Sequence, residues 1–149
     1  MLDSAVAIHF AEMGDVTVRR EYEPLEAVTL DRHKLIQILG NLLSNARHAL
    51  KNRVGGPREL TLRVRRHGGD SLAIEIVDTG VGIQPEVLPR LFEFGFTTKK
   101  DGHGFGLHTS AILAKELAGE LLAYSEGAGC GARFVLRLPA GAAEHRKLA

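Results

Sequence analysis

Apolar residues recur along the chain with two periods, and each period predicts one kind of element. Spacings of three and four residues are typical of a helix that packs one face on a core. They predict helices over residues 32–50 and 107–118 and a short helical piece over residues 85–91. Alternation of apolar and polar residues is typical of a half-buried strand. It predicts strands over residues 16–22, 60–66, 72–77, 121–125 and 133–138.

The layout of these elements predicts the fold class. A four-residue connection, residues 67–70, joins the second and third strands and is typical of an antiparallel hairpin. We expect an α+β fold, a two-layer α/β sandwich in which helices cover one face of a mixed, mostly antiparallel sheet. Residues 16–139 would form this domain. Residues 140–149 are small and polar enough to form a flexible tail.

Composition narrows the class of protein. The 149 residues are enough for one domain, and a formal net charge of +1 with scattered basic residues argues against nucleic acid as a partner. The single Cys130 excludes an internal disulfide, and no apolar stretch approaches the length that spans a bilayer. Residues 1–15 lack the pattern of a secretory signal. We therefore expect a soluble protein of a reducing compartment, with no membrane contact by this domain.

Asp78 is the first candidate for a binding residue. It directly follows the predicted strand 72–77, so a rigid sheet would position its carboxylate. Gly80 and Gly82 lack Cβ atoms, which lets the backbone bend sharply and lets a flat ring lie against it. This arrangement suits an adenine ring whose amino group donates to Asp78.

Two asparagines on the first long predicted helix form a second candidate. Asn41 and Asn45 are four residues apart, so they share one helix face. An asparagine oxygen is a neutral, hard ligand of the kind that Mg²⁺ takes together with phosphate oxygens and water. Asn45 fits this role. The alternative is that both side chains bond to backbone or water at a helix edge.

A third candidate is the glycine cluster before the second long helix, at Gly102, Gly104 and Gly106. A helix N-terminus presents unpaired N–H groups to a phosphate. Neither common glycine motif applies, because Leu107 replaces the last glycine of GxGxxG and the P-loop pattern is absent. The preceding segment adds hydroxyl groups and a cation, from Thr97, Thr98 and Lys99. Lys99 is the candidate phosphate contact, and a flexible loop with a solvated lysine is the alternative.

Along the chain these motifs follow one another in the order Asn45, Asp78 with its glycines, Phe92 and Phe94 with residues 97–99, and the glycine cluster from Gly102. This order gives the chain a resemblance to a known family. From about residue 16 to residue 138 it resembles the catalytic ATP-binding domain of sensor histidine kinases. That family shares a superfamily with gyrase, Hsp90 and MutL. The resemblance implies the Bergerat-type fold, a layered α/β sandwich that holds ATP between helices and a mobile lid, and it implies ATP and Mg²⁺ as cofactors.

The resemblance also implies individual roles. Asn45 would bind Mg²⁺ and Asp78 the adenine. Gly80 and Gly82 would shape the adenine pocket, and the glycines at 102, 104 and 106 would border the phosphates. Three features depart from the usual pattern, namely His48 for a lysine or arginine, Phe105 for a leucine, and a short stretch between Lys99 and Gly102. The full set expected at ATP is Asn41, Asn45, His48, Asp78, Gly80, Gly82, Ile83, Phe94, Thr97, Thr98, Lys99, Gly102, Gly104, Phe105, Gly106 and Leu107.

Asn41 separates the branches of this superfamily. In the hydrolases a glutamate one turn before the metal asparagine activates water, whereas an asparagine amide cannot accept a proton at neutral pH. A kinase needs no such base, because its catalysis rests on positioning and charge neutralisation. We therefore expect a histidine kinase domain. The alternatives are an ATP-hydrolysing clamp of the gyrase or MutL type, a nucleotide-independent protein-binding module with this fold, and a kinase for protein serine.

The acceptor histidine of such a kinase is expected outside this chain. None of the seven histidines stands in the family's acceptor pattern, so no catalytic residue is expected within the chain. The resemblance implies a dimerisation and phosphoacceptor helix domain of the same kinase and a response regulator receiver domain as partners. Residues 1–15 would be a linker or the end of a missing dimerisation helix region. The expected location is cytoplasmic, in a parent kinase that is either soluble or anchored in a membrane.

Overall fold

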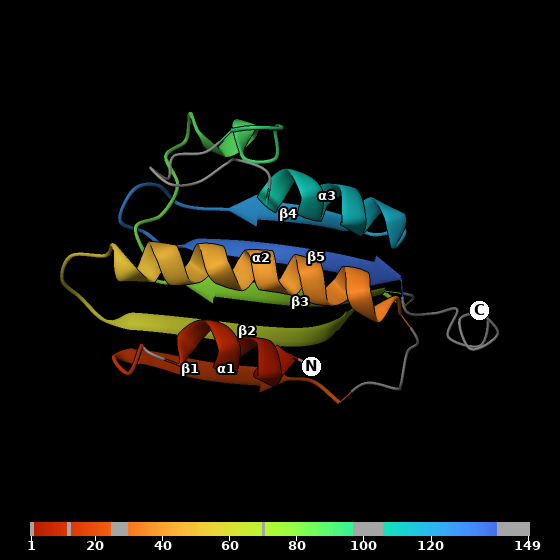
Figure 1. Cartoon of the computed structure of the whole chain (residues 1–149), viewed down its shortest axis with the longest axis horizontal. Helices are drawn as coiled ribbons and strands as arrows, with labels where there is room; N and C mark the ends of the chain where they lie inside the picture. Colours follow the sequence, from red (N-terminus) through yellow and green to blue (C-terminus); the bar gives the residue numbers. More distant parts are fainter. Residues whose placement is uncertain (1, 12, 25–29, 70, 97–105, 140–149) are drawn as a thin grey trace.

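The computed structural model describes residues 2–11, 13–24, 30–69, 71–96 and 106–139, and this part of the chain forms a five-stranded sheet with helices on one face (Figure 1). The strand order is β1-β2-β3-β5-β4. β1 runs parallel to β2, and all other neighbours are antiparallel. The predicted mixed sheet and the predicted hairpin are thereby confirmed. The strands are β1 Val16–Tyr22, β2 Arg58–His67, β3 Ser71–Asp78, β4 Glu120–Tyr124 and β5 Ala132–Pro139.

Three α-helices among the described residues lie on the same side of the sheet, with α2 between the other two (Figure 1). They are α1 Leu2–Phe10, α2 Arg32–Lys51 and α3 Gly106–Glu116. The Asp31 side chain accepts a hydrogen bond from the Lys34 N–H at 3.2 Å and caps α2 as expected. Past α3, Ala118 has a φ of 61°, and the Gly119 N–H donates to the Ala114 carbonyl at 2.8 Å, which ends the helix.

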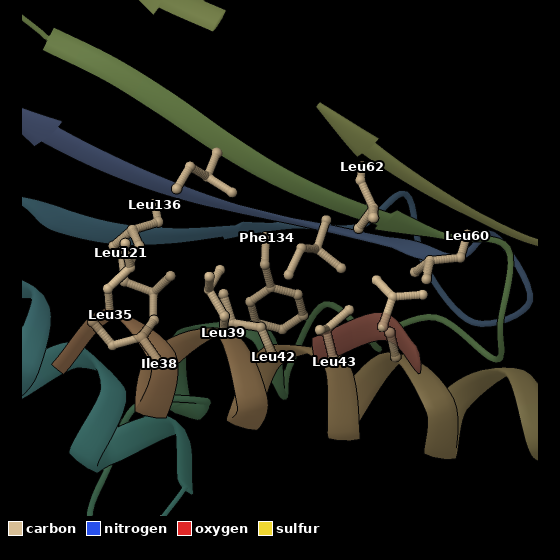
Figure 2. Close-up of a cluster of buried hydrophobic side chains, with 14 of the residues drawn as sticks. Leu35, Ile38, Leu39, Leu42, Leu43, Leu60, Leu62, Leu121, Phe134 and Leu136 are labelled. Atoms are coloured by element: carbon tan, nitrogen blue, oxygen red, sulfur yellow. The ribbon is translucent and has the colours of Figure 1, made fainter. Parts of the chain in front are cut away.

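The core lies between α2 and the sheet. Leu39, Leu42 and Leu43 of α2 are buried against strand residues from β2 to β5, among them Leu62 and Phe134 (Figure 2). The spacing of these leucines keeps them on one helix face, so burying that face fixes α2 across the middle of the sheet. This placement brings the polar edge of α2 to the ends of the strands, where the candidate site lies.

The observed helices differ from the predicted ones at two places. No element was predicted for residues 1–15 beyond a linker or the end of a dimerisation helix region, and in the structure α1 packs on α2 and buries Val6 and Phe10 in the core. Apolar residues occur on all sides of this segment, so no single face stands out in the sequence. The helical piece expected over residues 85–91 is only a 3-10 helix, η1 Leu88–Arg90. The division of the chain into a linker, a domain and a tail stays a prediction, and the expected tail lies outside the described residues.

Candidate nucleotide-binding site

Asp78 lies at the end of β3, where the chain leaves the sheet beside the C-terminal end of α2 (Figure 1). Its side chain is only 4% exposed. Burial raises the pKa of the Asp78 carboxyl to about 6, although the backbone N–H groups of Gly80, at 2.8 Å, and of Ala132 hydrogen-bond to it and lower that pKa. No cation within the described residues contributes to this shift. The carboxylate therefore keeps acceptor capacity in a poorly hydrated place.

Gly80 packs directly against α2. A Cβ at this position would lie 2.5 Å from the Ala49 carbonyl carbon, which no side chain tolerates. The Val81 N–H donates to the Ala49 carbonyl oxygen at 3.2 Å, and the Arg53 guanidinium donates to the Thr79 carbonyl oxygen. The segment after Asp78 is thus joined to the last turn of α2 through backbone groups.

Gly82 makes a similar close approach on the other side. Its φ is +76°, and a Cβ would lie 2.2 Å from the carbonyl oxygen of Gly127 in the β4–β5 connection. We expected Gly80 and Gly82 to make room for a flat ring. In the structure the room that their side chains would take is filled by neighbouring backbone, so both glycines are required by the packing of the loop itself.

Asn41 and Asn45 lie on the face of α2 that also carries Ala49, because positions four residues apart superpose along a helix. The Asn41 amide nitrogen donates to the Gly106 carbonyl oxygen at 3.1 Å and to the Ser110 hydroxyl oxygen at 2.9 Å. Asn41 therefore contacts the start of α3, and Ala49 contacts the segment after Asp78. Asn45 is half-buried between these two points. The structure thus brings the asparagine, aspartate and Gly106 motifs to one helix face.

The remaining predicted residues are placed less closely together. His48 is exposed near the end of α2, Ile83 is half-buried, and Leu107 packs at the edge of the core. Phe94 is 71% exposed, and its ring meets the edge of the His108 ring with centroids 5.2 Å apart. The other predicted residues, Thr97, Thr98, Lys99, Gly102, Gly104 and Phe105, lie outside the described residues and stay predictions.

Sequence reasoning missed two side chains that hold this region. Arg53 bonds to Thr79, and Ser125 accepts from the Ile83 N–H at 3.0 Å. Both act on backbone groups of distant residues, and no short motif signals such contacts. Among the described residues no cluster of three or more His, Cys, Asp or Glu side chains could hold a metal ion. A metal prediction therefore depends on the Asn45 amide oxygen.

A helix-covered mixed sheet with a buried carboxylate at a strand end and an asparagine-bearing helix beside it defines a domain of the layered α/β class. Residues 30–142 match the model of the family described as histidine kinase-, DNA gyrase B- and HSP90-like ATPases, and the chain belongs to this family. The resemblance to the catalytic domain of sensor histidine kinases is confirmed.

Sensor protein FixL of Bradyrhizobium diazoefficiens is 35% identical over 137 residues, which is 91% of this chain and 26% of FixL. The chain thus spans about a quarter of that relative. The mycobacterial sensor histidine kinase MprB has the same fold, with a TM-score of 0.79, 22% identity, and coverage of 93% of this chain and 91% of that chain. Full-length ShkA in complex with AMPPNP aligns with a TM-score of 0.78 and 26% identity, over 95% of this chain and 29% of ShkA. The expected fold class is confirmed by these likenesses.

No helix in the described part of the chain combines the length and the apolar character needed to cross a membrane.

Proposed function

We propose that this domain binds ATP with Mg²⁺ and donates the γ-phosphate to a histidine on a separate domain of a two-component sensor kinase. The observation that carries the proposal is Asp78, buried at a fixed strand end, hydrogen-bonded by backbone N–H groups and with no cation of the described residues contributing to its pKa. A buried carboxylate in this state is stabilised by a neutral N–H donor, because such a donor satisfies it without a second charge. The 6-amino group of adenine is a donor of this kind.

Asn41 supports phosphoryl transfer over hydrolysis. Its amide nitrogen donates to Gly106 and Ser110, so the side chain connects α2 to α3. An amide in this position cannot take a proton from water. The chemistry that remains is positioning of the triphosphate, with the nucleophile supplied from outside the chain. The described residues of α2 contain no aspartate or glutamate that could replace Asn41 as a base.

Mg²⁺ fits the residues beside the expected phosphates. The Asn45 amide is the hard oxygen donor on the α2 face between the Asp78 segment and the start of α3. Mg²⁺ usually takes one or two protein oxygens and completes its shell with phosphate oxygens and water. When bound, it would neutralise phosphate charge. α3 begins at Gly106, whose carbonyl Asn41 contacts, and the unpaired N–H groups at the start of a helix favour anions. We propose Lys99 and the glycines at 102 and 104 as further phosphate contacts.

The partners follow from the missing nucleophile. We propose a dimerisation and phosphoacceptor helix domain of the same kinase as the acceptor, and a response regulator receiver domain as the next carrier of the phosphoryl group. The names of the relatives support this, since FixL is called a sensor protein and PprA of Pseudomonas aeruginosa a two-component sensor. The complex of ShkA with AMPPNP supports an adenine nucleotide as ligand. We propose a cytoplasmic location, where ATP is available.

A calorimetric titration of the chain with ATP, with and without Mg²⁺, tests the proposal. Binding should strengthen with Mg²⁺ and weaken at least about tenfold in Asp78→Asn, because the amide offers N–H groups where the carboxylate accepted. Ser71→Ala, at the opposite end of β3, is the control and should bind as the unchanged chain does. Turnover by the chain alone should be negligible. ATP affinity unaffected by Asp78→Asn, or rapid hydrolysis, would contradict the proposal.

A further inference from the structure

The β4–β5 connection, residues 125–131, packs against the segment 78–83 that follows β3 (Figure 1). Ser125 is the central contact. Its hydroxyl oxygen accepts from the Ile83 N–H at 3.0 Å and donates its hydrogen to the Gly131 carbonyl oxygen at 2.6 Å. It also accepts from the Gly127 N–H at 3.3 Å. One small side chain therefore contacts backbone groups of three residues, Gly127, Gly131 and Ile83, and Ile83 lies 42 residues away in sequence.

Both ends of the segment 78–83 depend on this connection. At the first end, Asp78 pairs with Ala132 in the sheet, and a Cβ on Gly131 would lie 2.2 Å from the Asp78 carbonyl oxygen. At the other end, Ile83 is held by the Ser125 hydroxyl, and between them the Gly129 N–H donates to the Val81 carbonyl oxygen at 2.7 Å. By its bonds to Gly131 and Ile83, Ser125 links the fixed end of the segment to its far end.

We propose that Ser125 is a positioning residue of the nucleotide site, which holds the wall of the adenine pocket at Ile83 in register with the Asp78 carboxylate. This inference rests on the proposed function. A hydroxyl donates and accepts at the same time, which alanine cannot do and threonine can. β3 fixes Asp78 by sheet pairing, but the chain beyond it has no strand partner and relies on such contacts. An adenine ring that reaches Asp78 is bound tightly only if the two ends of the segment 78–83 keep their spacing.

A simpler explanation is that Ser125 only stabilises its own turn, through the local bond from the Gly127 N–H. That role would leave the nucleotide site untouched. The two explanations differ in what the loss of the hydroxyl does to nucleotide affinity compared with stability. They also differ in which part of the nucleotide would lose binding contacts. ATP and ADP share the adenine end, so a defect there weakens both by one factor.

The test compares Ser125→Ala, Ser125→Thr and the control Ser71→Ala in the full 149-residue chain. Each is titrated with ATP and with ADP in the presence of Mg²⁺, at a temperature at which its melting curve shows full folding. Ser125→Ala should weaken ATP and ADP by the same factor, about five- to tenfold. Ser125→Thr should restore both affinities to within about twofold of the original. Ser71→Ala should change neither.

Unchanged affinity in folded Ser125→Ala would overturn the inference, and so would a loss that Ser125→Thr does not restore, since the hydroxyl would then not be responsible. A loss for ATP without a loss for ADP would place the effect at the γ-phosphate and overturn it as well. These results leave ATP binding by the unchanged chain and its dependence on Asp78 intact. Failure of the proposed function would give a different result, because the unchanged chain itself would then not bind ATP.

Discussion

β3 carries two buried carboxylates three residues apart, and their surroundings shift their pKa values in opposite directions. Glu75, on the sheet face that the helices leave open, is 2% exposed and is surrounded by the guanidinium groups of Arg63, Arg65 and Arg133. Burial alone would raise the pKa of Glu75, but hydrogen bonds from Arg65 and Arg133 and their charges lower it overall. Asp78 has no such cation within the described residues, and burial raises its pKa to about 6.

The difference separates a carboxylate that is neutralised within the fold from one that fits the proposed role of adenine acceptor. Glu75 is neutralised by ion pairs with three arginines, so its charge is already compensated in the folded chain without a ligand. Asp78 is held by backbone N–H groups alone, and its ionised form is disfavoured until a ligand donates to it. A raised pKa at a fixed strand end is a feature that recurs at functional sites, and it supports the role proposed for Asp78.

Asp78→Asn should give the largest effect and the clearest contrast. ATP affinity should fall by about 1.5–3 kcal/mol, since a charge-assisted hydrogen bond is lost. The free energy of unfolding at pH 7 should rise by about 1–2 kcal/mol, because a carboxylate with a raised pKa destabilises the folded state when ionised. Calorimetric titration and urea denaturation measure the two quantities. A variant that loses both affinity and stability would mean that Asp78 is structural, like Glu75.

Glu75→Gln should have the opposite pattern. It should lower the free energy of unfolding by about 2 kcal/mol, because three partly exposed arginines lose their shared counter-charge. ATP affinity should stay within about twofold, since the side chain points to the other face of the sheet from Asp78. The same two measurements apply. Loss of ATP affinity at full folding would show that the two faces of β3 are coupled.

The pH dependence of ATP binding further tests the difference between Asp78 and Glu75. The Asp78 pKa is raised from 3.8 to about 6, so its ionised form, the form that binds, is present above pH 6 and lost as pH falls through it. Apparent ATP affinity should therefore drop about tenfold between pH 8 and pH 5. For stability the sign is reversed, since the penalty of the raised pKa is present above pH 6 and fades as pH falls.

Glu75→Gln is the matched control for this profile, because Glu75 has a lowered pKa and stays ionised at pH 5. It should keep the same fall in affinity. The phosphates of ATP also titrate near this range, so the residual binding of Asp78→Asn at high ATP gives the part that belongs to the ligand. A profile identical in Asp78→Asn and in the unchanged chain would remove Asp78 as the titrating group.

The sequence predicted most of the fold. All five strands were placed within two residues of their observed ends, and α2 within one, because their periodicity is strong. Asp78 and Asn41 could be singled out because each belongs to a short contiguous motif, and their roles at ATP stay predictions. The parallel pairing of β1 with β2 was not predicted, since nothing local specifies it. Arg53 and Ser125 were missed for the same reason, as their partners lie 26 and 42 residues away.

The smallest effect should come from an arginine that, like the partners of Glu75, pairs with a glutamate on the open face of the sheet, but with one that is partly exposed. Arg19 pairs with Glu59 at 2.9 Å on the open face of β1 and β2, with 60% of its side chain exposed. Arg133 pairs with buried Glu75 at 3.1 Å and stacks on the Tyr124 ring at 4.4 Å. Arg19→Ala should change the free energy of unfolding by less than about 0.5 kcal/mol, because solvent screens an exposed pair. Arg133→Ala should lower the free energy of unfolding by about 1–2 kcal/mol, since it removes a partner of a buried charge and a cation–π contact.

Urea denaturation at low and high salt measures the effects of both variants. The small Arg19 effect should vanish at high salt while most of the Arg133 effect persists, and equal costs for the two would mean that the burial of Glu75 does not set the value of its ion pairs.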